Sequence, residues 1–133
     1  MATRERPLSP FMIGQVYRPQ LTSVLSILHR ATGVALALGA FALVAWLLAV
    51  AGEGQSFASF QAIAGSLVGK LALMAFAACL VYHFLNGIRH LLWDVGWGFE
   101  LPRVYASGYV VVAMTLVLTA TIVYFGLAAG GSA

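Results

Sequence analysis

Charged residues divide this chain into long apolar blocks. Each block can cross a hydrocarbon core about 30 Å thick as an α-helix. The uncharged blocks cover residues 31–52, 71–88 and 104–133. Helix-compatible sequence before the first block, and aromatic residues after the second, extend the predicted helices beyond the blocks. We predict an all-α membrane protein with three transmembrane helices, at about residues 22–51, 66–95 and 104–127.

The first helix is expected to begin shortly after Pro19, a residue that suits the position just ahead of a helix, so that Arg30 lies on the helix. Residues 1–20 are then an N-terminal cytoplasmic segment, and residues 21–133 form the transmembrane anchor domain. The first apolar stretch starts too far into the chain, and is too long, for the h-region of a signal peptide. We expect it to be retained in the protein.

The distribution of basic residues predicts the orientation. The first loop holds only Glu53 and Lys70, whereas basic residues precede the first span and flank the second loop. These basic residues are Arg4, Arg6, Arg18 and Arg30 before the first span, and Arg89 and Arg103 at the second loop. The positive-inside bias places the N-terminus and the second loop inside, and the C-terminus outside.

Composition narrows the candidate chemistry. The chain is 62% hydrophobic and 8% charged with a net charge of +3, and its few charges form no patch that could bind nucleic acid. The single cysteine, Cys79, excludes an internal disulfide framework, a thiolate-held iron–sulfur cluster and a C-x-x-C-H haem attachment. A cofactor must therefore be held by nitrogen, oxygen or packing.

Polar residues recur along one face of the first predicted helix. Thr22, Ser26 and Arg30 are spaced by four residues, and His29 lies beside them. Ionisable groups inside a span are costly, and they tend to be paired or functional. From its position alone, Arg30 is also explained as an anchor at the lipid headgroups.

A second polar face follows from the spacing of His83, Gly87, His90 and Asp94 at intervals of four, three and four. Taken alone, His83 suits an interhelical hydrogen bond as well as a ligand role. For Arg89, His90 and Asp94, position near the inner boundary favours interfacial snorkelling or ion pairing.

Geometry limits how these histidines could hold an iron. His83 and His90 are about 10.5 Å apart along one helix and cannot clasp one iron. The depth of His29, measured from the start of the uncharged run at residue 31, and that of His83, measured from Trp93, differ by roughly 18 Å. This difference makes His29 a poor partner for His83 at one iron. If His83 binds an iron axially, the opposite imidazole is expected from another polypeptide. Arg30 and His29 then remain to meet carboxylates such as haem propionates.

Three segments carry a family resemblance: RPLSP at residues 6–10, YRPQLTSVLSILHRATG at 17–33, and HFLNGIRHLLWD at 83–94. Together they resemble the cytochrome b membrane-anchor subunit of succinate dehydrogenase, respiratory complex II. The resemblance covers essentially the whole chain, and S-x-x-H-R-x-T-G with H-x-x-x-G-x-R-H-x-x-x-D is specific in combination. One departure is Phe11, where many members have a histidine.

The resemblance implies a three-helix anchor that pairs with a second small anchor subunit beneath a flavoprotein and an iron–sulfur subunit. It implies haem b shared between the two anchors, ubiquinone as substrate, and lipid around the helices. The chain would be a subunit of succinate:ubiquinone oxidoreductase without catalysis of its own. The short N-terminus favours a bacterial inner membrane over a mitochondrial one.

Carried over residue by residue, the resemblance makes His83 the axial haem ligand, with His29 and Arg30 facing the propionates and His90 near the haem. It places Ser26, Ile27 and Arg30 in the ubiquinone pocket and Asp94 at the pocket's periphery. The chemistry agrees, because a hydroxyl can hydrogen-bond a quinone oxygen and a guanidinium can stabilise developing negative charge.

Other functions remain open on the sequence alone. A structural or assembly subunit could use its histidines only to crosslink helices, and a fumarate reductase anchor would look similar. A proton-conducting subunit with His29, His83 and His90 as a relay is disfavoured, because the outer half of the membrane then has only Lys70 as an ionisable group.

Overall fold

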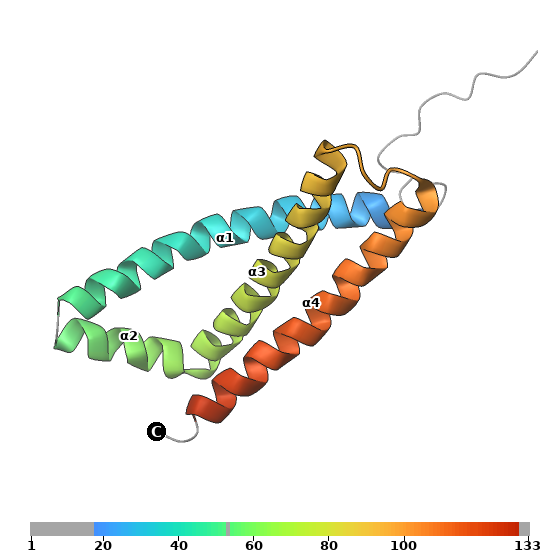
Figure 1. Cartoon of the computed structure of the whole chain (residues 1–133). Helices are drawn as coiled ribbons and strands as arrows, with labels where there is room; N and C mark the ends of the chain where they lie inside the picture. The colour runs from blue at the N-terminus through green and yellow to red at the C-terminus, as the bar shows by residue number, and fades with distance from the viewer. Residues whose placement is uncertain (1–17, 53, 131–133) are drawn as a thin grey trace, which may run out of the picture.

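The computed structural model describes residues 18–52 and 54–130. Within this part the chain is helical and contains no strand. Its helices are α1 (Leu21–Ala51), α2 (Gln55–Gly65), α3 (Leu67–Asp94) and α4 (Leu101–Gly130) (Figure 1). Three of them, α1, α3 and α4, are long and apolar enough to cross a membrane. This confirms the predicted all-α architecture with three candidate spans. The expected N-terminal segment lies mostly outside the described residues, as do Phe11 and Tyr17.

The ends of the long helices follow from local chemistry. Helix α1 begins two residues after Pro19 and runs for 31 residues, about 46 Å at 1.5 Å per residue. At the start of α3, the Ser66 hydroxyl accepts a hydrogen bond from the Gly69 N–H at 3.1 Å. After α3, Gly96 and Gly98 adopt positive φ values of 82° and 85°, which only glycine adopts at little cost. These two glycines turn the chain from α3 toward α4.

The connection between the first and second spans is itself helical, which the sequence analysis did not predict. Helix α2 has 11 residues and packs against both α1 and α3. Its half-buried residues are Phe57, Phe60 and Ala64. Their spacing of three and four residues is that of one helical face, and it is the signal in the sequence that indicates this element.

Helix α3 is the centre of the fold. It packs along α4 and crosses α1, whereas α1 and α4 meet over a smaller area. Leu25, Tyr82 and Val111 form a buried cluster that joins the three long helices. The Tyr82 hydroxyl donates a 2.7 Å hydrogen bond to the Leu25 carbonyl oxygen. At Gly108 an added Cβ would lie 3.0 Å from Leu25, so glycine lets α4 approach α1 closely.

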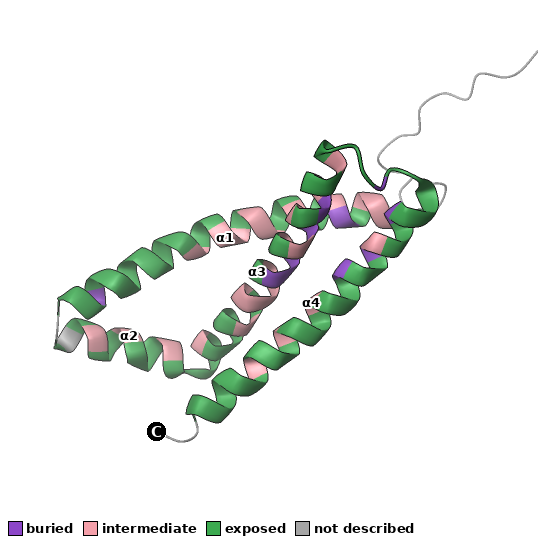
Figure 2. Ribbon diagram, viewed as in Figure 1, coloured by how far each residue is buried: buried purple, intermediate pink, exposed green. Residues whose placement is uncertain are grey.

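Most side chains of the long helices are exposed, and the buried ones other than Ala49 gather toward one end of the molecule (Figure 2). This end contains the start of α1, the end of α3 and the start of α4. Along the rest of α1, apolar side chains such as Leu38 and Phe41 are 66% and 76% exposed. An apolar surface of this extent requires lipid or other protein around it.

Candidate functional site

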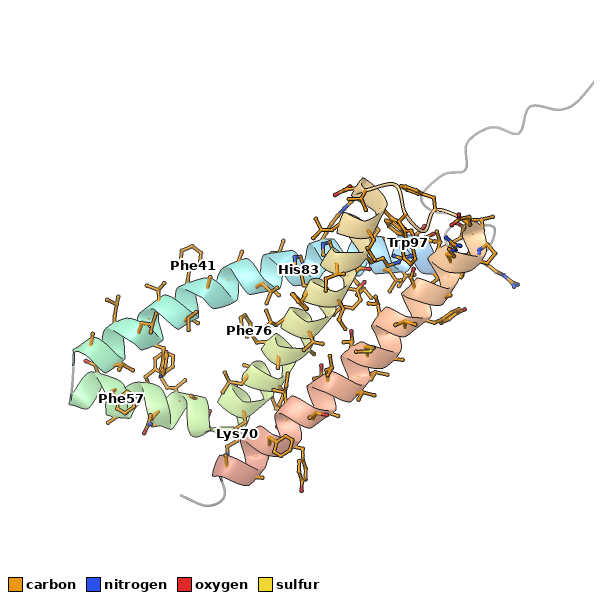
Figure 3. All side chains as sticks on the ribbon, in the orientation of Figure 1. Phe41, Phe57, Lys70, Phe76, His83 and Trp97 are labelled. Carbon is orange, nitrogen blue, oxygen red and sulfur yellow. The ribbon has the colours of Figure 1, made fainter. Side chains whose placement is uncertain are left out.

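Three histidine rings stack where α1 crosses α3. His29 comes from α1, and His83 and His90 come from α3. The His29 and His83 ring centroids are 4.0 Å apart with the planes 8° from parallel, and the His29 and His90 centroids are 4.8 Å apart at 16°. The ring of His29 therefore lies between two rings that are two helical turns apart on α3. Figure 3 marks His83 at this crossing.

The predicted separation in depth between His29 and His83 is wrong, because their rings are in contact. The estimate took residue 31 and Trp93 to lie at the same interface, but α1 begins at Leu21, ten residues before residue 31, and crosses α3, so these two positions are not at the same depth. Rings stacked face to face still cannot bind one iron between them, because the lone pair of an imidazole nitrogen lies in the plane of its ring and does not point at the other ring. Within the described ranges no group of three His, Cys, Asp or Glu side chains could hold a metal ion.

The hydrogen bonds of His83 fix which of its nitrogens is free to act as a ligand. Its Nδ1 lies 3.0 Å from the carbonyl oxygen of His29 and 3.2 Å from the Thr32 hydroxyl oxygen. A carbonyl can only accept, so Nδ1 carries the proton and Nε2 keeps its lone pair. An imidazole oriented in this way by a backbone carbonyl has the form that metal-ligating histidines take. The residues at this position therefore fit an axial haem ligand.

A glycine makes this arrangement possible. A Cβ added at Gly33 would lie 3.1 Å from Cε1 of His83, tighter than ordinary contact. The glycine of the sequence motif therefore gives the His83 ring room against α1. This role of Gly33 could not be read from its spacing, which indicated only close helix packing in general.

The other two histidines differ in their hydrogen bonding. His90 Nδ1 lies 2.8 Å from the Asn86 carbonyl oxygen one turn earlier, so its Nε2 also keeps the lone pair. His29 Nδ1 is buried and has no hydrogen-bond partner within residues 18–52 and 54–130. A buried polar atom without a partner is costly, and a ligand or another chain commonly satisfies it.

The residues expected at the quinone pocket lie on α1 next to the histidine stack. Ser26 is half-buried one turn before Arg30, while Arg30 and Ile27 are exposed. The structure thus brings Ser26 and Arg30 onto one face, but residues 18–52 and 54–130 leave the Arg30 side chain exposed there. Asp94, the last residue of α3, is exposed and makes no ion pair with the residues that the structure describes.

Arg89 is a functional candidate that the sequence analysis misplaced. It was expected to snorkel to the interface or to pair with an acid, but it is only 4% exposed and points toward α4. Its Nε donates to the Ser107 hydroxyl at 2.9 Å and its Nη2 to the Val104 carbonyl at 2.8 Å. Its guanidinium carbon lies 4.0 Å from the centre of the Trp93 ring. Helical position explains the error, because Arg89 lies on the side of α3 that faces α4.

The three long apolar helices are those of a small multi-pass membrane protein. Histidine rings stack between two of them, so imidazole nitrogens are available there to a ligand. A family model described as succinate dehydrogenase/fumarate reductase transmembrane subunit matches residues 2–122. The chain belongs to this family of respiratory membrane subunits.

Individual relatives agree with the family match. The succinate dehydrogenase cytochrome b556 subunit of Rickettsia prowazekii is 41% identical over 115 residues, covering 86% of this chain and 88% of the relative. The cytochrome b556 subunit of Paracoccus denitrificans is 37% identical over 113 residues, covering 85% of each. The human mitochondrial cytochrome b560 subunit is 37% identical over 84% of this chain and 66% of its own length.

Proposed function

We propose that this chain is the haem b-binding membrane anchor of a succinate:ubiquinone oxidoreductase. In this role it anchors a flavoprotein and an iron–sulfur subunit and forms part of the site where ubiquinone is reduced. The observation that carries the proposal is His83, whose Nδ1 is bonded to the α1 backbone and whose Nε2 is left as a ligand. Relatives named cytochrome b556 subunits of succinate dehydrogenase support it.

Three side chains would hold the haem, and a fourth would lie beside it. His83 Nε2 would be this chain's ligand to the iron, and a second anchor subunit would supply another. His29, whose Nδ1 has no partner among the described residues, and the cationic Arg30 would bind the propionates, because carboxylates pair well with such donors. His90 lies two turns away as part of the haem environment. When bound, haem b supplies one-electron redox chemistry.

The quinone site uses the face of α1 beside the histidines. The Ser26 hydroxyl hydrogen-bonds a quinone carbonyl oxygen, and Arg30 stabilises the negative charge that develops on the quinone oxygens during reduction. Ile27 contacts the ring or the isoprenoid tail. Asp94 is at the periphery, where an exposed carboxylate can exchange protons with water. Partner subunits close the pocket, because this chain leaves Arg30 and Ile27 exposed.

The membrane arrangement follows from charge. The N-terminus and the α3–α4 connection face the cytoplasm of a bacterial cell and the C-terminus faces outward, as the positive-inside bias favours. The soluble subunits then dock at the end where α1 starts. This is also the end with the histidine stack, so the haem and quinone groups lie near the electron donors.

The decisive experiment is an absorbance difference spectrum of the purified complex. We expect a b-type spectrum on reduction, lost in His83→Ala and retained in His90→Gln, since only His83 has the ligand role. An unchanged spectrum in His83→Ala would remove this residue as the ligand. A complex without haem in which the helices still assemble would favour a structural subunit, whose histidines only join α1 to α3.

A further inference from the structure

A cavity of about 560 Å³ lies between α3 and α4, on the side of α3 that carries Arg89. It is at the end of the molecule where Trp97 and the α3–α4 connection lie (Figure 3). The residues proposed for haem and quinone, which lie on α1 and on the α1-facing side of α3, do not line it. The cavity therefore needs an occupant of its own.

Arg89 forms part of the cavity wall and is a buried cation without a counter-charge. All its partners are neutral: the Ser107 hydroxyl, the Val104 carbonyl, the Asn86 side-chain oxygen at 3.5 Å and the Trp93 ring. No carboxylate among the described residues pairs with it. Burying a charge without an opposite charge is costly. Two of its five N–H donors also have no partner in residues 18–52 and 54–130, so an anion at this wall would be bound and would offset the charge.

The lining changes from polar to apolar along the helices. Near the α3–α4 connection it contains Trp97 and Arg103, whose guanidinium lies 5.7 Å from the centre of the Trp97 ring. Deeper in the membrane the walls are Leu85 on α3 and Val111 and Met114 on α4. These apolar walls form a slot between α3 and α4, which extends about 10 Å along α3 from Leu92 to Leu85. Tryptophan and arginine near a helix end with apolar side chains below are the surroundings of a lipid headgroup and its acyl chain.

We propose that this cavity binds one anionic phospholipid. The phosphate accepts hydrogen bonds from Arg89 and from the N–H groups of Arg103 that its 3.5 Å ion pair with Glu100 leaves over, and one acyl chain lies in the apolar slot between α3 and α4. An anionic lipid satisfies both observations at once, because it supplies the missing negative charge and fills the slot. A free phosphate would leave the slot empty, and a neutral quinone would leave the charge of Arg89 without compensation. The proposal does not depend on haem or quinone binding.

The test measures lipid bound to the intact complex. The complex is purified in mild detergent and analysed by native mass spectrometry after addition of phosphatidylglycerol or phosphatidylcholine. We expect retention of one phosphatidylglycerol at this site, with phosphatidylcholine washed out. Arg103→Gln removes one phosphate contact and should lower occupancy about fivefold to tenfold, as expected when a charge-assisted hydrogen bond is lost. Inorganic phosphate should not compete at matched concentration.

Two further variants make the test specific. Ala106→Phe fills the slot without changing any charge, and we expect it to abolish retention of the lipid. Lys70→Gln removes a cation of the same sign beside a separate cavity at the opposite end of the molecule, and we expect it to keep the lipid. Retention unchanged in Ala106→Phe, equal losses in Arg103→Gln and Lys70→Gln, or equal binding of both lipids would each overturn the proposal.

Discussion

The Thr32 side chain contacts the Nδ1 atom of His83 and so affects the donor strength of this imidazole. Its hydroxyl lies 2.8 Å and 3.0 Å from the Leu28 and His29 carbonyl oxygens, so its own proton is used within α1. Its lone pair then faces the His83 Nδ1–H at 3.2 Å. Together with the His29 carbonyl, this oxygen makes the imidazole a stronger electron donor to whatever Nε2 binds.

Thr32→Val should therefore raise the haem midpoint potential while the haem stays bound. Removing one acceptor weakens the donor strength of His83 and favours the reduced iron. We expect a shift on the order of 20–60 mV, the one-electron equivalent of a hydrogen bond of about 0.5–1.5 kcal/mol. Thr32→Ser, which keeps the hydroxyl, is the matched control in a redox titration of the complex. Identical potentials in both variants would contradict this role.

Ser26 and Arg30 should matter for quinone reduction and not for succinate oxidation. Ser26→Ala loses a hydrogen bond to the quinone and Arg30→Lys loses the planar guanidinium fork. We expect each to slow reduction of ubiquinone about 10- to 100-fold, corresponding to about 1.5–3 kcal/mol. Electron transfer from succinate to a soluble artificial acceptor should be unchanged.

Thr22→Val provides the control for the quinone assay, since Thr22 is on the same face one turn before Ser26. It should keep both activities. Parallel loss of both activities in Ser26→Ala or Arg30→Lys would instead indicate a complex that does not assemble.

At the scale of the helices, the crossing of α1 and α3 depends on small residues. A Cβ added at Gly39 would collide with the ring of Phe76 on α3. Gly33, which also lacks a side chain, leaves space for the ring of His83 in the same way. Interfaces of this kind, in which a small residue accepts a large side chain, hold transmembrane helices together by close packing. The crossing in turn sets where the histidines meet.

Gly39→Ala should therefore destabilise the protein, by about 1–3 kcal/mol as expected for overpacking. Thermal denaturation in detergent, followed by circular dichroism, measures the effect. Gly126→Ala is the matched control, because Gly126 also lies in a long helix and nothing lies within 4 Å of its added Cβ. Replacing Phe76 by Leu in the Gly39→Ala background should restore part of the loss. Equal behaviour of Gly39→Ala and Gly126→Ala would contradict the contact.

The sequence predicted the three long helices because membrane spans require long apolar runs, a signal that needs no knowledge of packing. It did not predict the contact of His29 with His83 or the burial of Arg89. Both depend on where helices cross and which side of α3 faces α4, which residue spacing along one helix does not determine. Helix α2 was not predicted because its apolar face is short and its polar residues are typical of a loop.

At the scale of the whole molecule, the two ends of the helix bundle differ in chemistry. The end that contains the start of α1, the end of α3 and the start of α4 carries Arg30, Arg89 and Arg103, while the opposite end carries Lys70 beside the junction of α2 and α3. The first end also holds the buried residues and the histidine stack (Figure 2). The two ends therefore present chemically different surfaces to partner subunits and to lipid.

Accessibility to a membrane-impermeant thiol reagent tests the proposed orientation. In a Cys79→Ser background, Glu100→Cys should be labelled only in inside-out vesicles and Ser66→Cys only in right-side-out vesicles. Both residues are exposed and lie at opposite ends of α3 or just beyond it. The reverse labelling pattern would invert the topology and place the quinone face on the outer side.

The hydrogen bond between His83 Nδ1 and the His29 carbonyl oxygen joins two helices of one polypeptide and needs no porphyrin. The ligand nitrogen is thus set in its final tautomer as soon as α1 and α3 meet after membrane insertion. If the chain has the proposed function, haem can bind last during assembly, and we expect cells starved of haem to accumulate an inserted apoprotein that accepts the cofactor when supply returns.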